Sequence, residues 1–213
     1  MFDLDGTLAD TLADIAASGN YALARLGLPP VPVPRYRYLA GQGAHWLVTE
    51  ALGPDHAAEI PQAEVFFREY QLSHGIDHTH PYPGIPEVLA GLIQRGLKLA
   101  VLSNKPDPAT QVAVRAVLGG VRFDAVAGQR AGDPLKPDPN RALAIARQLA
   151  IAPERWWYLG DTRVDMETAR RAGFFAVGVL WGFRDQPELH AAGAQALIHH
   201  PRELLDLIDA AQP

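Results

Sequence analysis

Short apolar runs alternate with helical segments over the second half of the chain, and this alternation constrains the fold more than any other feature. Strands are expected at 97–102, 125–127, 156–159, 175–179 and 196–198, and helices at 87–95, 108–118, 140–149, 164–172 and 201–210. Strands that alternate with helices predict a parallel, doubly wound sheet. The apolar pair Met1-Phe2 leads directly into Asp3 and is expected to add one more strand.

Residues 12–81 lack strand-like runs and are predicted to be helical instead. Apolar residues recur at helical spacing from Leu12 to about Leu28, and the loop Gly41-Gln42-Gly43 opens a second helix. A third helix is expected at about 57–73. One face of this third helix carries Val65, Phe66 and Tyr70.

Together these patterns predict an α/β fold, a doubly wound (Rossmann-like) parallel sheet core with an inserted all-helical cap domain. The predicted core comprises residues 1–11 and 82–213, and the predicted cap comprises residues 12–81. The first strand is short for a central strand, since only Met1 and Phe2 precede Asp3. We therefore expect the native chain to start upstream of Met1.

Composition excludes several classes of protein. The 213 residues include no cysteine, which excludes disulfides, thiol catalysis and zinc–thiolate sites. The formal net charge of −5 argues against extensive binding to the backbone of nucleic acids. No apolar run is long enough to span a bilayer, and no secretory pattern follows Met1. We therefore expect a cytoplasmic protein with no nucleic-acid or membrane partner, either a monomer or a homodimer.

Polar side chains follow four of the predicted strands. They are Asp3 and Asp5, then Ser103 and Asn104, then Lys136, and finally Asp161 and Asp165. Each has an ordinary explanation on its own, as a turn residue, a helix cap or a solvated loop lysine. A calcium loop at Asp3 is excluded, because the third acid and the glutamate at its twelfth position are missing. Because the carboxyl ends of parallel strands meet at one edge of a sheet, we expect these side chains to lie together.

This set of residues indicates a chemistry. Up to four carboxylates at one edge would repel one another strongly, so a positive charge is required among them. Oxygen ligands without nearby histidine or cysteine favour a hard cation, and Mg²⁺ is the predicted cofactor. A metal ion, a lysine, a serine hydroxyl and backbone N–H groups together suit a phosphoryl group. One carboxylate can then attack phosphorus and form an aspartyl-phosphate, while a second acts as general acid and general base.

The segments that carry these residues resemble, in order and spacing, the motifs of the haloacid dehalogenase-like superfamily of phosphohydrolases. They are Phe2–Leu8, Leu102–Lys105, Lys136–Pro139 and Gly160–Gly173. The resemblance implies that Asp3 is the nucleophile and Asp5 the general acid/base, and that Ser103 and Lys136 bind the phosphoryl group. It also implies that Mg²⁺ is held by Asp3, the Asp5 backbone carbonyl and Asp161, with Asp165 supporting the ion directly or through water.

Within that superfamily the chain resembles the phosphoglycolate phosphatases. The segments similar to that family are Leu39–Ala44 with Leu47-Val48, Ser103–Pro106 and Gly178–Phe183. The resemblance implies hydrolysis of 2-phosphoglycolate to glycolate and phosphate beneath a helical cap. The expected substrate-binding and phosphate-binding residues are Ser103, Asn104, Lys105, Lys136, Gly41 and Gln42. The candidates for holding a substrate carboxylate are Arg35, Arg37, Gln42 and Lys105.

Other interpretations stay open at this point. The chain could act on another small phosphorylated metabolite such as a sugar phosphate, as a phosphatase or a mutase, or could bind phosphate without catalysis. His74, His78 and His80 cluster in the sequence and could suggest zinc, but a solvated hinge is favoured. The segment Arg35-Tyr36-Arg37-Tyr38 could stack on nucleic acid, but the acidic chain favours a cap loop.

Overall fold

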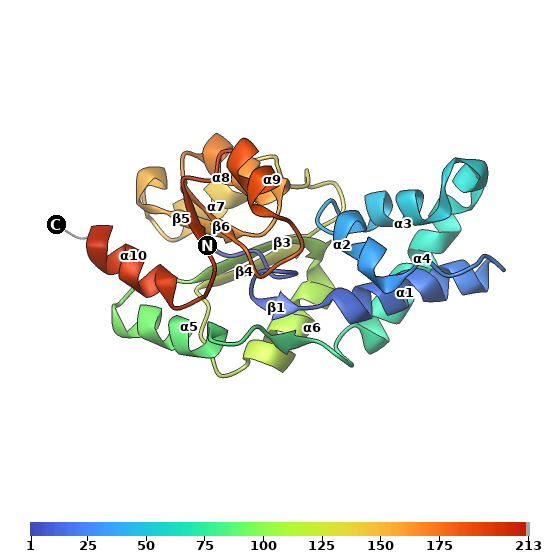
Figure 1. Cartoon of the computed structure of the whole chain (residues 1–213), viewed down its shortest axis with the longest axis horizontal. Coiled ribbons are helices and arrows are strands. Elements are labelled where there is room, and N and C mark those ends of the chain that lie inside the picture. Colours follow the sequence, from blue (N-terminus) through green and yellow to red (C-terminus); the bar gives the residue numbers. More distant parts are fainter. Residues whose placement is uncertain (212–213) are drawn as a thin grey trace.

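A parallel β-sheet forms the centre of the structure, a computed structural model that describes residues 1–211 (Figure 1). Its strands are β3 (Ala100–Pro106), β4 (Ala125–Gln129), β5 (Trp157–Gly160), β6 (Phe175–Val179) and β7 (Ala196–Ile198). Strand β3 pairs with β4, and β5, β6 and β7 pair in that order, all in parallel. Phe2 forms parallel bridges to both Val101 and Leu159, so the start of the chain joins the two groups of strands. The expected first strand is therefore central, although it is only a bridge long.

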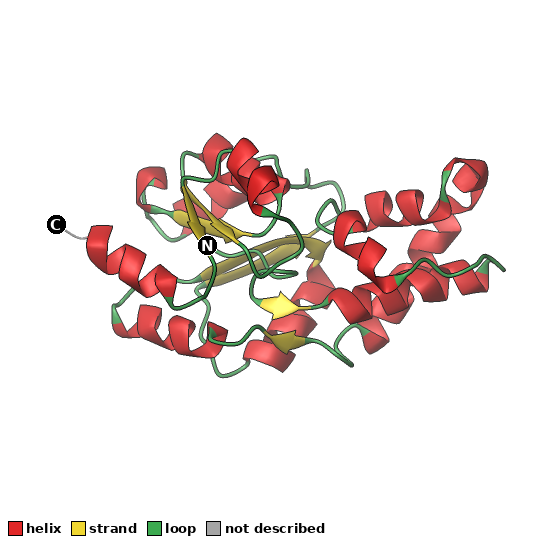
Figure 2. Ribbon diagram, in the orientation of Figure 1, coloured by secondary structure: helices red, strands yellow, loops and turns green. Residues whose placement is uncertain are grey.

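Helices cover both faces of this sheet (Figure 2). One face carries α5 (Ile85–Gln94), α6 (Asp107–Leu118) and α10 (Glu203–Ala211), and the other carries α7 (Asn140–Gln148), α8 (Arg163–Ala172) and α9 (Gln186–Ala191). Successive strand residues alternate between the two layers, as the two-residue period of a strand requires. Val101 and Leu159 pack in the first layer, while Leu102 and Tyr158 pack in the second. The predicted α/β fold with a parallel sheet is confirmed, and α9 is an addition that the sequence patterns did not predict.

A separate group of helices, which we call the helical region (residues 12–74), lies at one end of the sheet (Figure 1). It contains α1 (Leu12–Arg25), α2 (Tyr36–Leu39), α3 (Ala44–Leu52) and α4 (Ile60–His74), with 3-10 turns at Val33–Arg35 and Pro54–Glu59. Its own apolar core includes Leu23, Tyr36, Leu47 and Phe67, each at most 4% exposed. The division into a core domain and a cap domain at the predicted boundaries stays a prediction.

One detail of the helical prediction is wrong, and the buried face of one helix was left open. The segment predicted to lack strands ends in β2 (His80–Pro81), which pairs antiparallel with β1 (Ala9–Asp10). A two-residue strand is too short to give a periodic pattern, and so the sequence did not reveal it. On α4, the buried face is Ala63, Phe67 and Gln71, whereas Val65 is 46% exposed. The helical period is compatible with burial of either face of this helix, and the face that is buried depends on the elements that pack against it.

Local sequence explains the helix that carries part of the site. Helix α8 begins with a capping box, in which the Thr162 side chain and the Asp165 side chain each bond to the other residue's backbone N–H. It ends at Gly173, whose left-handed φ of 74° suits glycine.

Among the helices of residues 1–211, none combines the length and the apolar character needed to cross a lipid bilayer.

Candidate active site

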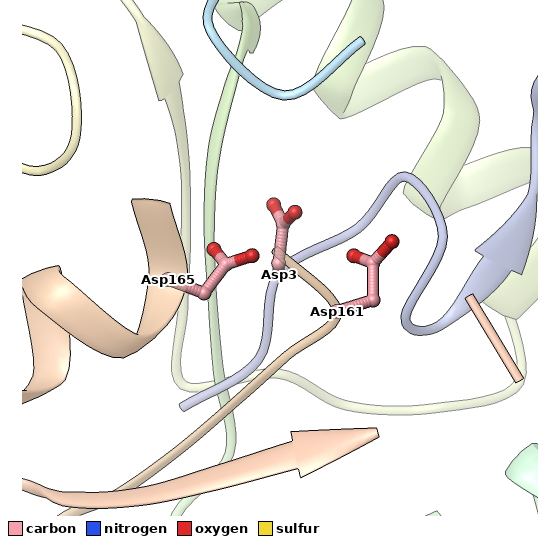
Figure 3. A group of neighbouring side chains, drawn as sticks. All are labelled: Asp3, Asp161 and Asp165. Atoms are coloured by element: carbon pink, nitrogen blue, oxygen red, sulfur yellow. The ribbon is translucent and has the colours of Figure 1, made fainter. Parts of the chain in front are cut away.

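Three buried aspartates meet at the carboxyl edge of the sheet (Figure 3). Asp3 ends the first strand, Asp161 follows β5, and Asp165 lies in the first turn of α8. One oxygen of each carboxylate lies within 4.8 Å of the others, and each residue is at most 4% exposed. Segments more than 150 residues apart in the sequence thus supply one acidic group.

Lys136 provides the positive charge beside these acids. Its Nζ lies 2.8 Å from Asp3 Oδ1 and 2.7 Å from Asp165 Oδ1, and its side chain is 3% exposed. Burial alone would lower the pKa of Lys136, but the charges of Asp165 and Asp3 raise it well above its usual value. Burial raises the pKa of Asp3 from 3.8 to about 7; Lys136 opposes this shift, while Asp165 and Asp5 add to it. The lysine therefore stays charged and stabilises a carboxylate that is difficult to ionise.

Asp161 is held by two segments far from it in sequence. Thr7 Oγ1 donates a hydrogen bond to Oδ1 at 3.0 Å, and the Phe183 backbone N–H donates to Oδ2 at 2.7 Å. A Cβ at Gly6, where φ is +82°, would lie 2.2 Å from Oδ2, and a Cβ at Gly182 would meet the Asp161 side chain at 2.3 Å. Burial, followed by the charges of Asp165 and Asp3, raises the pKa of Asp161 well above 3.8.

Both oxygens of Asp165 also have hydrogen-bond donors, and one of these donors is the charged Lys136 ammonium. Thr162 donates to Oδ2 through its hydroxyl at 2.7 Å and its backbone N–H at 3.1 Å. Lys136 donates to Oδ1. This carboxylate therefore caps α8 and positions Lys136 besides facing the acidic group.

The donor set fits a hard divalent cation. Three carboxylates face one lysine, so full ionisation would leave an excess of negative charge in a buried space. The Lys136 ammonium is close to Asp3 Oδ1, but no hydrogen bond is aligned with this buried oxygen. A set of carboxylate oxygens without sulfur or imidazole suits Mg²⁺. Asp3, Asp161 and Asp165 are the residues that could hold such an ion.

Asp5 and Lys105 form a second ion pair beside the acidic group. Lys105 Nζ lies 3.1 Å from Asp5 Oδ1, and both side chains are largely buried, at 3% and 13% exposed. The Asp5 carboxylate lies outside the three-carboxylate group, and the metal-binding role expected for its backbone carbonyl stays a prediction. Ser103 Oγ accepts a hydrogen bond from the Lys105 backbone N–H at 3.2 Å, which fixes the backbone near the end of β3.

The helical region closes over these residues through the loop at Gly41. Asn104 Nδ2 donates to the Gly41 carbonyl at 2.9 Å and to the Lys136 carbonyl at 3.1 Å. A cavity of about 40 Å³ remains beneath the loop. It is lined on the sheet side by Asp3, Asp5, Ser103, Asn104, Lys105 and Pro106, and on the helical side by Ile15, Ala40, Gly41, Gly43, Ala44, Leu47, Phe67 and Gln71.

Several sequence candidates lie elsewhere. Gln42 is not among the residues that line the cavity, and Arg35 and Arg37 are exposed. Arg37 donates instead to the Gly182 carbonyl at 2.6 Å, which ties the helical region to the loop after β6. Of the four residues considered for a substrate carboxylate, Lys105 alone lines the cavity.

The histidines near the hinge do not converge on a shared site. His74 pairs with Asp77 and His78 with Asp14, while His80 Nδ1 faces the His78 carbonyl. The side chains of His74 and His78 are 50% and 70% exposed, in agreement with a solvated hinge.

Sequence reasoning missed three residues of the site. Thr7 lies in the first motif, but nothing in the pattern indicated that its hydroxyl would bond to Asp161. Phe183 acts through its backbone N–H, which no side-chain pattern can reveal. Gln71 stands on the buried face of α4, and a single glutamine on an apolar stripe was the available signal.

Comparisons with known proteins identify relatives of this chain. A family model described as haloacid dehalogenase-like hydrolase matches residues 1–179. N-acetylmuramic acid 6-phosphate phosphatase of Pseudomonas aeruginosa is 35% identical over 99% of this chain and 94% of its own length. Phosphoglycolate phosphatase of Aquifex aeolicus is 31% identical over 98% of this chain and 95% of its own length. The solved structure of a haloacid dehalogenase-like family hydrolase from Streptococcus pneumoniae superposes with a TM-score of 0.87 at 26% identity, covering 97% of this chain and 96% of that one.

The chain is thus similar, over almost its full length, to a class of phosphatases. The chain belongs to the haloacid dehalogenase-like hydrolase family. The family resemblance recognised from the sequence motifs is confirmed.

Proposed function

We propose that this chain is a Mg²⁺-dependent phosphomonoesterase that works through an aspartyl-phosphate on Asp3. The observation that supports this proposal is the buried group of Asp3, Asp161 and Asp165, with Lys136 paired to Asp3 and Asp165. Such a group has no evident purpose in packing, because each buried charge raises the cost of the others. When bound, Mg²⁺ supplies positive charge that offsets these carboxylates and the phosphoryl oxygens.

The chain's residues then divide the chemistry between them. An Asp3 carboxylate oxygen attacks phosphorus, and the ester oxygen leaves with a proton from Asp5. Asp5 next accepts a proton from the water that attacks the aspartyl-phosphate, which releases inorganic phosphate and regenerates Asp3. Lys136 holds the Asp3 carboxylate and adds positive charge near the transferred group. Ser103 and Asn104 line the cavity, where the Ser103 hydroxyl and the Asn104 backbone N–H would orient phosphoryl oxygens.

The helical region acts in this proposal as the cap that excludes water from the reaction. Its loop at Gly41 rests on Asn104, and a Cβ at Gly41 would lie 3.3 Å from Thr162. The remaining cavity of about 40 Å³ favours a small substrate, because a larger one would require the helical region to move away. We therefore place 2-phosphoglycolate first, in line with the activity named for the Aquifex aeolicus relative.

A second candidate is a sugar phosphate. The Pseudomonas aeruginosa relative is named for N-acetylmuramic acid 6-phosphate and matches almost the full length of both chains. A bulkier substrate of that kind predicts a cap that opens widely during each turnover.

Phosphate release from a panel of esters tests the proposal. The panel contains 2-phosphoglycolate, N-acetylmuramic acid 6-phosphate, hexose phosphates, a nucleotide and pyrophosphate, each with Mg²⁺ and with a chelator. Metal-dependent release that favours 2-phosphoglycolate supports the proposal, and preference for a sugar ester retains the mechanism but replaces the substrate. Formation of a phosphate isomer indicates a mutase, and phosphate binding without turnover indicates a non-catalytic module. Either result contradicts the hydrolysis proposed.

A further inference from the structure

Gln71 is a polar side chain on the buried face of an otherwise apolar helix stripe. Ala63, Phe67 and Gln71 follow one another at intervals of four residues along α4, and they are 0%, 2% and 6% exposed, respectively. A four-residue interval places side chains on the same face of a helix, so Gln71 points the same way as two core residues. Leucine at this position would continue the stripe without burying a polar group.

The Gln71 carboxamide has no internal partner for its oxygen. Within residues 1–211, the buried side-chain atoms that lack a hydrogen bond are Asp3 Oδ1, Thr11 Oγ1 and Gln71 Oε1. Leaving a buried acceptor unpaired destabilises a protein, so such a group calls for an explanation. Asp3 and Gln71 line the same cavity, and Asp3 is the proposed nucleophile.

The two sides of that cavity differ in polarity. The sheet side presents Asp3, Ser103 and Lys105, which suit a phosphoryl group. The helical region, all of whose residues the structure describes, contributes Ile15, Leu47 and Phe67, glycine and alanine positions, and Gln71. Gln71 is therefore the polar side chain that the helical region offers to a bound molecule.

We propose that Gln71 is a specificity-determining residue, which hydrogen-bonds the oxygen function that the substrate carries at the end away from its phosphate. The inference rests on the function proposed above and deepens it. The chemical class is a short phosphomonoester with one carboxylate or hydroxyl at its far end. A half-turn of the carboxamide presents Nε2 in place of Oε1, so one side chain serves as donor to a carboxylate or as acceptor from a hydroxyl. With 2-phosphoglycolate the bonded group is the carboxylate.

A comparison of two esters in matched variants tests this assignment. The esters are 2-phosphoglycolate and ethyl phosphate, which lacks the carboxylate. The variants are Gln71→Leu and Gln62→Leu, the same change at an exposed position of the same helix. The ratio of kcat/KM between the two esters is expected to fall by roughly 10–100-fold in Gln71→Leu, because one hydrogen bond to a charged group is lost. The ratio in Gln62→Leu is expected to equal that of the wild type.

Two further measurements separate recognition from folding. Gln71→Leu is expected to keep or raise Tm, because it removes an unpaired buried amide from an apolar face. In an Asp3→Asn background, which binds without turnover, 2-phosphoglycolate is expected to raise Tm less when Gln71→Leu is added, while inorganic phosphate acts equally on both proteins.

Three results would overturn the assignment. An unchanged ratio, or an equal loss on both esters, would show that Gln71 only supports the fold. If the wild type prefers another ester, the ratio of kcat/KM is taken between that ester and ethyl phosphate. If Gln71→Leu leaves this ratio unchanged, the specificity role of Gln71 is refuted while the phosphatase proposal stands. A wild type that releases phosphate from none of the esters refutes the proposed function and this inference with it.

Discussion

The sheet side and the helical side of the cavity are built from opposite kinds of residue. On the sheet side, oppositely charged side chains lie close together and form ion pairs, as Lys136 does with Asp3 and Asp165. On the helical side, apolar side chains surround a single amide, Gln71. The positions of the first group are fixed by strand ends, whereas those of the second depend on how α1, α3 and α4 pack.

In the function proposed above, this difference separates the residues that carry out the reaction from those that select the substrate. Residues that react with a phosphoryl group must keep their charge balance, so a change at one of them disturbs all the others. Residues on the helical side carry no charge network, and a change there alters what fits rather than what reacts. Four predictions test the contrast, and they run from the largest expected effect to the smallest.

The nucleophile should show the largest effect on activity. Asp3→Asn is expected to lower kcat by at least about 10³-fold, because an amide cannot form the aspartyl-phosphate. The measurement is phosphate release at saturating 2-phosphoglycolate with Mg²⁺. Circular dichroism of the variant serves as the folding control. Retention of more than a tenth of the wild-type rate would exclude Asp3 as the nucleophile.

Removal of the central lysine should show the largest effect on stability. Lys136→Met is expected to lower the free energy of unfolding by about 3–5 kcal/mol, because the buried carboxylates lose their counter-charge. Urea unfolding with a chelator present measures this loss. The matched control is Lys98→Met, which breaks the Asp124 pair of a lysine side chain 55% exposed and should cost at most about 1 kcal/mol. Equal losses in the two variants would contradict a charge-dependent site.

A carboxylate of the helical region should act on stability alone. Asp14 is 2% exposed and accepts hydrogen bonds from the His78 backbone N–H and, at 2.6 Å, from Thr79 Oγ1. Asp14→Ala leaves these donors unpaired and is expected to cost about 1–3 kcal/mol. The control is Asp77→Ala, where the acid is 51% exposed.

The effect of Asp14 should also depend on pH. Burial favours a higher pKa for Asp14, but the hydrogen bonds from Thr79 and His78 outweigh it and hold the pKa below 3.8. A lowered pKa in the folded state means that the stabilisation is complete above pH 3.8 and is lost as the pH falls through the folded value. The difference in unfolding free energy between wild type and Asp14→Ala should therefore shrink in acid. A difference that grows below pH 3.8 would contradict the assignment.

Metal binding should give the smallest of the four effects. Mg²⁺ at ten times its Kd is expected to stabilise the wild type by about 1.4 kcal/mol. Asp161→Asn should reduce this gain, because it removes one of the proposed ligands. Thermal unfolding with Mg²⁺ and with a chelator measures the gain for both proteins. An equal gain in both would place the metal elsewhere.

The fold was largely predictable because strand and helix periods differ so clearly in the second half of the chain. Strands β6 and β7 have the predicted bounds, and the strand ends deliver polar residues to one edge as parallel pairing requires. The short ribbon of β1 and β2 escaped prediction, since two residues make no period. The inward face of α4 was not predictable, because Phe66 and Phe67 lie on different faces and the sequence alone does not say which one meets α1 and α3.

The site was predictable as a list of charged residues but not as a set of contacts. The sequence order placed Asp3, Lys136 and Asp161 at neighbouring strand ends, yet it did not show that Asp5 pairs with Lys105. Gln42 and Arg37 were selected for their polarity near the cap loop, but side-chain direction there depends on tertiary packing. Backbone donors such as the Phe183 N–H leave no trace in residue identity.

Phe183 belongs both to the apolar core of the helical region and to the acidic site at the edge of the sheet. Its ring is 4% exposed within the apolar core of the helical region, and its N–H donates to Asp161 at 2.7 Å. If the helical region swings outward, either the ring leaves its apolar surroundings or Asp161 loses a donor. In the proposed enzyme, the position of the helical region and the geometry of the Asp161 carboxylate would be linked in this way, so that admitting a substrate and holding a cation would not be independent events.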